Sequence, residues 1–74
     1  MEIRNPEIKQ YKSKLKQFRV VHGLTQNNLS ALSGVNIKSI TMYEQHPEKI
    51  NKASVDTVNA LAQCVGCTIE DLIE

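Results

Sequence analysis

The chain has 74 residues and a formal net charge of +1, with 41% hydrophobic and only 4% aromatic residues. This length allows one domain with a small core, and the apolar content argues against an intrinsically disordered chain. The sequence has no apolar run of the roughly 20 residues that a membrane-spanning helix needs. It also begins without the apolar stretch of a signal peptide, so we expect a cytoplasmic protein.

A first helix is predicted over residues 7–22, after a frayed leader at residues 1–6. Gly23 ends this helix, because glycine is poorly suited to a helix interior. The apolar residues of this segment recur at helical spacing, at Ile8, Tyr11, Leu15 and Phe18.

The next two predicted helices are short and are joined by one turn. The first of them covers residues 26–33 with Thr25 as its N-cap, and the second covers residues 37–45 with Asn36 as its N-cap. Gly34 lies in the turn, where a residue with φ > 0 ends the preceding helix. This is the pattern of a helix-turn-helix, whose second helix can lie in the major groove of DNA.

Side-chain size supports the same arrangement. The two helices can pack closely only if the residue at their crossing is small, and Ser30 fits that place. Val35 and Ile40 are expected to fix the second helix of the motif in the core.

Two further helices are predicted after residues 46–53, which contain a proline and no apolar period and are therefore expected to form a loop. Ser54 caps a fourth helix that ends at Gly66. Thr68 then opens a short last helix, with Asp71 as a capping-box partner. The apolar face of the fourth helix is predicted to comprise Val55, Val58, Leu61, Ala62 and Val65.

A family resemblance rests on two stretches, LKQFRVVHGLTQNNLSALSGVNIKSITMYEQ and LAQCVGCTIEDLIE. They resemble the Cro/lambda-repressor-like helix-turn-helix family of prokaryotic and phage transcription regulators, of the xenobiotic-response-element type. The resemblance covers residues 14–74 and implies an all-α, compact five-helix DNA-binding domain. Residues 1–13 would then form the leader and the start of the first helix. The resemblance also implies binding to double-stranded operator DNA, usually as a homodimer.

The resemblance further implies which residues meet DNA. Gln26 is expected to touch the DNA backbone and to brace the recognition helix, at about residues 36–45. Ile37, Lys38 and Met42 stand where bases are most often read. Lys38 can donate to guanine O6 and N7, whereas Ile37 and Met42 can pack on a thymine methyl group. The residues expected on the exposed face of this helix are Asn36, Ile37, Lys38, Ser39, Thr41 and Met42.

Charge is distributed unevenly along the chain. Residues 9–52 carry eight basic and two acidic side chains, whereas residues 53–74 carry four acidic and no basic ones. This asymmetry suits a domain with one basic surface that faces the DNA phosphates and an acidic surface that faces away from DNA. The resemblance implies that Lys49 and Lys52 lie along the sugar–phosphate backbone. It also implies an ion pair between Arg19 and Glu44 that fixes the recognition helix.

Cys64 and Cys67 form a CxxC pair, which by itself is a weak signal. A structural zinc site needs four ligands, and the sequence has only two cysteines, with no histidine at a ligand-like spacing. We therefore expect reduced thiols that pack as small hydrophobic groups, and neither a metal nor another cofactor. The sequence also lacks a catalytic constellation, so no enzymatic activity is expected.

Two other functions stay open at this point. One is an antitoxin-type or phage-encoded module whose main partner is another protein, with Ile37 and Met42 as interface residues. The other is a small redox or metal protein built on the CxxC pair. A protein partner found by co-purification would favour the first, and metal analysis would test the second.

Overall fold

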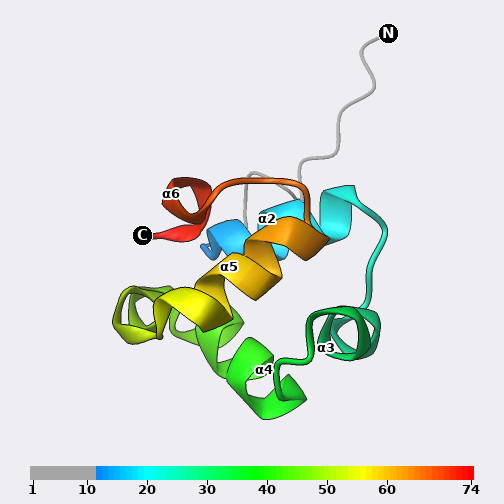
Figure 1. Ribbon diagram of the computed structural model, residues 1–74, viewed down its shortest axis with the longest axis horizontal. Coiled ribbons are helices and arrows are strands. Elements are labelled where there is room, and N and C mark those ends of the chain that lie inside the picture. The colour runs from blue at the N-terminus through cyan, green and yellow to red at the C-terminus, as the bar shows by residue number, and fades with distance from the viewer. Residues whose placement is uncertain (1–11) are drawn as a thin grey trace, which may run out of the picture.

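Helices make up most of residues 12–74, the part of the chain that the computed structural model describes (Figure 1). These residues contain no strand, and the predicted all-α fold is confirmed. No helix among them has the length and apolar character needed to cross a membrane. The elements are α2 (Lys14–Val21), α3 (Gln26–Ser33), α4 (Ile37–Gln45), the 3₁₀ helix η1 (Pro47–Lys52), α5 (Val55–Cys64) and α6 (Ile69–Leu72).

Aliphatic side chains from the five α-helices of the described region meet in one core. Each α-helix contributes a residue whose exposed fraction is 0%, and α5 lies across the middle of the molecule between the others (Figure 1). Burying one such side chain contributes about 1.5–3 kcal/mol. The core therefore depends on several short helices packing at once, and its central residues are Leu15, Leu29, Ile40, Leu61 and Leu72.

The first helix of the described region begins later than predicted. Ser13 has an extended backbone (φ −90°, ψ 125°), and its Oγ accepts a hydrogen bond from the Lys16 N–H at 3.1 Å. Ser13 is thus the N-cap of α2, and the prediction of one continuous helix over residues 7–22 is wrong at this point. The serine hydroxyl satisfies a backbone donor and so competes with a preceding helical turn. The predicted leader and residues 7–11 lie outside the described residues.

Residues 46–53 are not the irregular loop that was predicted, because Pro47–Lys52 forms η1. Proline suits the start of this helix, since its fixed φ is already helical and it has no N–H to satisfy. Ile50 is only 3% exposed and fixes η1 to the core. One buried residue gives no periodicity, which explains why the sequence pattern did not reveal the segment.

The last two helices follow the prediction with one exception. Val55 is 69% exposed, so its assignment to the buried face of α5 is wrong. It lies at the start of the helix, where it lines a shallow depression with Ile73 at the edge of the core. Thr68 and Asp71 form the expected capping box at the start of α6. The other predicted residues of the α5 face are buried, namely Val58, Leu61, Ala62 and Val65.

Candidate nucleic-acid interface

The turn between α3 and α4 has the predicted geometry. Gly34 has φ 79° and donates its N–H to the Ser30 carbonyl at 2.9 Å, which closes α3. The small side chain of Ser30 is half-buried, and its hydroxyl donates to the Val35 carbonyl at 2.6 Å. Ser30 therefore both leaves room at the helix crossing and satisfies a carbonyl of the turn. At the other end of α3, Thr25 and Asn28 form a capping box.

Helix α4 has a buried side and an exposed side. Ile40 is fully buried and Tyr43 is only 8% exposed, so both hold the helix in the core. Lys38 and Met42 are exposed, and so is Asn36 immediately before the helix. The Asn36 Oδ1 accepts a hydrogen bond from the Lys38 N–H at 2.7 Å, which confirms the predicted N-cap.

The exposed side of α4 is narrower than the sequence predicted. Ile37, Ser39 and Thr41 are half-buried rather than exposed. The Thr41 hydroxyl donates to Gln26 Oε1 at 3.0 Å, so this side chain is turned toward α3. Of the residues predicted on this side, the exposed ones are thus Asn36, Lys38 and Met42, and Met42 is only 36% exposed.

A partly buried ion pair joins α2 to α4. Arg19 Nε lies 2.6 Å from Glu44 Oε2, and Arg19 Nη2 lies 2.9 Å from Glu44 Oε1, so the pair is bidentate. The side chains are only 10% and 3% exposed, and Arg19 Nη1 also donates to the Leu24 carbonyl at 2.7 Å. Two parallel charge-assisted hydrogen bonds fix direction as well as distance. The predicted pairing of Arg19 with Glu44 is therefore confirmed.

Gln26 extends this pair into a network across three helices. Its Nε2 donates to Glu44 Oε1 at 2.9 Å, while its Oε1 accepts from Thr41. Both ends of the amide thus contact α4, and the bracing role expected for Gln26 is present. An amide nitrogen carries two N–H donors, and among the described residues only one is used.

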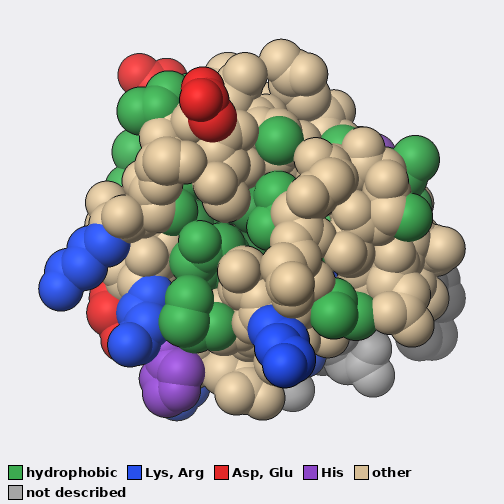
Figure 2. Space-filling view, turned by 60° about the horizontal axis from the view of Figure 1, so that its bottom comes forward, with side chains coloured by type: hydrophobic (Ala, Val, Ile, Leu, Met, Phe, Trp, Pro, Cys, Tyr) green, Lys and Arg blue, Asp and Glu red, His purple; other side chains and the backbone are tan. Residues whose placement is uncertain are grey.

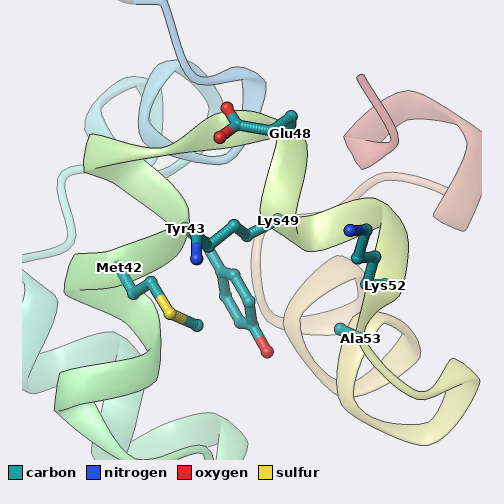
Figure 3. A pocket seen from close by; sticks show the side chains of 6 residues that line it. All are labelled: Met42, Tyr43, Glu48, Lys49, Lys52 and Ala53. Atoms are coloured by element: carbon teal, nitrogen blue, oxygen red, sulfur yellow. The ribbon is translucent and has the colours of Figure 1, made fainter.

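Basic side chains lie beside α4, on η1. Lys49 and Lys52 are exposed and border a groove between η1 and the last turn of α4 (Figure 3). On the face shown in Figure 2, Lys and Arg side chains gather at the lower left and lower edge, and acidic side chains lie at the upper edge and beside the lysines. Tyr43 also lines the groove, and the sequence analysis did not single it out.

The two cysteines pack against the core. Cys64 and Cys67 are free and half-buried, and the Cys67 N–H donates to the Ala62 carbonyl at 2.9 Å in the cap of α5. Burial, together with the negative charge of Asp71, raises the pKa of the Cys67 thiol. A redox-active cysteine needs the opposite shift, toward thiolate. Within residues 12–74, no group of three or more His, Cys, Asp or Glu side chains is placed to hold a metal.

The α3–turn–α4 unit, with α4 fixed to α2 and exposed on one side, defines a helix-turn-helix domain. Comparison with protein families gives the same answer: the model of the Cro/C1-type HTH DNA-binding domain matches residues 14–74. The chain therefore belongs to this family, as the motif resemblance implied. No match was found among curated proteins or among solved structures.

Proposed function

We propose that this protein is a small transcriptional regulator that binds double-stranded DNA sequence-specifically, with α4 in the major groove. The observation that carries this proposal is the fixed position of an exposed helix. α4 presents Lys38 and Met42 to solvent, while Glu44 on the same helix is held by the Arg19 guanidinium and the Gln26 amide. A helix held in this way can enter a DNA groove without losing much conformational freedom.

The exposed residues divide into two roles. Lys38, in the first turn of α4, is suited to the acceptors of guanine, and Met42 and the exposed part of Ile37 are suited to a thymine methyl group. Backbone contacts give register and affinity but carry no base information. The residues proposed to contact or approach phosphate and sugar are Gln26, Asn36, Ser39, Thr41, Lys49 and Lys52.

We further propose that two copies bind a palindromic operator. One α4 spans only a few base pairs, which is too little information to specify a site in a genome. A two-fold homodimer doubles the site, and its half-sites would lie about 10 base pairs apart, one turn of DNA.

Selection of bound sequences from a random pool of duplex DNA tests this proposal. We expect enrichment of a palindrome and a steep loss of affinity with rising salt, because each lysine–phosphate contact releases counterions. A selected pool without a shared motif would overturn sequence-specific binding. Absence of binding at low salt would overturn DNA binding altogether.

A protein partner is the second candidate, favoured by the apolar Met42 side chain, which is 36% exposed on the same face. Ile37, the other proposed interface residue, is half-buried and offers less surface. Met42→Ala separates the candidates. Under the DNA proposal it changes preference at one base position, whereas under the partner proposal it removes a co-purifying protein.

A further inference from the structure

A groove runs between the last turn of α4 and η1, beside the proposed DNA-reading face. Figure 3 shows its lining side chains entering from both elements. Because Met42 belongs both to the exposed face of α4 and to this groove, the two surfaces are continuous. The groove is lined by Met42, Tyr43, Glu48, Lys49, Lys52 and Ala53.

Tyr43 places a polar atom in this groove that its own domain does not use. The residue is only 8% exposed, so its ring belongs to the core. Within residues 12–74, no side-chain hydrogen bond involves Tyr43, yet no buried side-chain oxygen or nitrogen lacks a partner. The hydroxyl is therefore open to solvent. Figure 3 shows it at the tip of the ring, pointing into the groove.

Two lysine side chains line the same groove as this hydroxyl. Lys49 and Lys52 come from η1 on the opposite side of the groove, and both are exposed. Neither forms an ion pair or a side-chain hydrogen bond with another described residue. Among the residues that the structure describes, Glu48 is the one acidic residue that lines the groove. A neutral O–H donor and two flexible cationic side chains thus line one groove, and the two lysines outnumber the single glutamate among its described lining residues.

We propose that Tyr43, Lys49 and Lys52 form a seat for one phosphate of the DNA backbone at the C-terminal end of α4. Phosphate oxygens accept hydrogen bonds from tyrosine hydroxyls and attract lysine ammonium groups. The buried ring holds the Tyr43 hydroxyl in place, so binding costs little side-chain entropy. This inference rests on the proposed DNA binding. It adds Tyr43, which would contact the phosphate through a neutral hydrogen-bond donor rather than a charge.

This phosphate contact would fix the angle of α4 in the major groove of DNA. Lys38 lies in the first turn of α4 and Tyr43 in its last turns. A base contact near one end and a backbone contact near the other define the direction of the helix along the major groove. Tyr43 therefore acts as a backbone-binding residue that sets register, without reading sequence itself.

The test compares Tyr43→Phe with Lys49→Ala on a mixed-sequence DNA duplex over a range of salt concentrations. Tyr43→Phe keeps the ring and removes one hydrogen bond, so affinity should fall about 3- to 10-fold while the melting temperature stays unchanged. The slope of log binding constant against log salt concentration should not change for Tyr43→Phe, because a neutral hydroxyl displaces no counterion. Lys49→Ala should instead reduce the steepness of this slope by about 0.9.

Glu48→Gln is the matched control within the same groove. It removes the opposing negative charge and should raise affinity, whereas a groove that never meets DNA would show no change.

Duplexes with a neutral methylphosphonate at one backbone position at a time locate the contact. On one of these duplexes the modified phosphate is the one that Tyr43 contacts. On that duplex, Tyr43→Phe should bind with the same affinity as the unmodified protein. Competition by inorganic phosphate as effective as that by duplex DNA would show a general anion site and overturn the backbone seat. If the unmodified protein binds DNA and Tyr43→Phe binds equally well, only the seat fails. If the unmodified protein does not bind at low salt, the proposed function fails with it.

Discussion

Within residues 12–74, two long-range polar networks join distant parts of the chain, and they differ in their exposure to water. The first joins α2, α3 and α4 through Arg19, Gln26 and Glu44, and the side chains of its ion pair are 10% and 3% exposed. The second joins the C-terminus to distant segments and is exposed. There, Lys14 Nζ donates to the Ile73 carbonyl at 3.0 Å, and the Glu74 N–H donates to Asn51 Oδ1 at 2.9 Å.

The difference shows where hydrogen bonds can specify structure. An exposed group that loses its partner is satisfied by water, so its net contribution is small. A buried charge that loses its partner keeps its desolvation cost. We therefore expect the first network to fix the recognition helix and the second mainly to reduce fraying of the chain end.

Arg19→Met should produce the largest loss of stability among the changes considered. It keeps an apolar stem of similar length but leaves the Glu44 carboxylate nearly buried with only the Gln26 amide as a partner. Breaking a buried ion pair in this way costs about 3–5 kcal/mol. Urea unfolding followed by circular dichroism measures this loss.

Arg19→Lys serves as the control, because lysine keeps the charge but cannot form the bidentate contact. Its loss should be smaller than that of Arg19→Met. Equal stability of Arg19→Met and the unmodified protein would contradict the role given to the buried network.

Gly34→Val should have the next largest effect, since it strains the turn between α3 and α4, two of the helices that the buried network joins. Apart from its two chain neighbours, no described residue has an atom within 4 Å of a Cβ placed on Gly34, so the cost comes from its φ of 79°. A β-branched residue in that conformation should lose about 1–3 kcal/mol. The melting temperature measures the effect.

Gly23→Val is matched, because Gly23 has φ 70° and is equally uncrowded. Both variants should lose stability. Only Gly34→Val should weaken DNA binding at equal folded fraction, because Gly34 sets the angle between α3 and α4. If both weaken it equally, the turn has no special role in presenting α4.

Most of the fold could be predicted from local patterns in the sequence. Caps such as Thr25 and Thr68 and the turn at Gly34 depend on interactions within a few residues, and the structure confirms them. The extent of the first helix and the existence of η1 could not be predicted. The first depended on whether Ser13 caps a helix or continues one, and the second on a single buried residue, Ile50.

Less of the candidate site could be predicted from the sequence, because the site depends on contacts between residues that are far apart in the chain. The pairing of Arg19 with Glu44 came only from family resemblance, and no local pattern indicated that Gln26 would bond to Thr41. Tyr43 has the spacing of a core residue, and a spacing cannot show that the end of its side chain reaches solvent. A tyrosine rather than a phenylalanine at this position was the one available signal.

Lys38→Ala should lower discrimination between operator and scrambled DNA, by about 1–3 kcal/mol if a guanine contact is lost. This sharpens the comparison, because base readout needs the helix that the buried network holds. Lys49→Ala, in η1, should weaken both DNAs alike. Binding of each variant to the selected operator and to scrambled duplex separates the roles. Equal weakening of both DNAs by Lys38→Ala would make Lys38 a phosphate contact.

Asn51→Ala should have the smallest effect, because it breaks the exposed network. It removes the bond from the Glu74 N–H and a weaker one, 3.3 Å long, from Asn51 Nδ2 to the Glu74 carbonyl. Water can reach both groups, so we expect a loss of about 0.5 kcal/mol and at most 1 kcal/mol. Hydrogen exchange should show faster exchange at the C-terminus, with α4 unchanged. A loss as large as that of Arg19→Met would show that exposure does not separate the two networks.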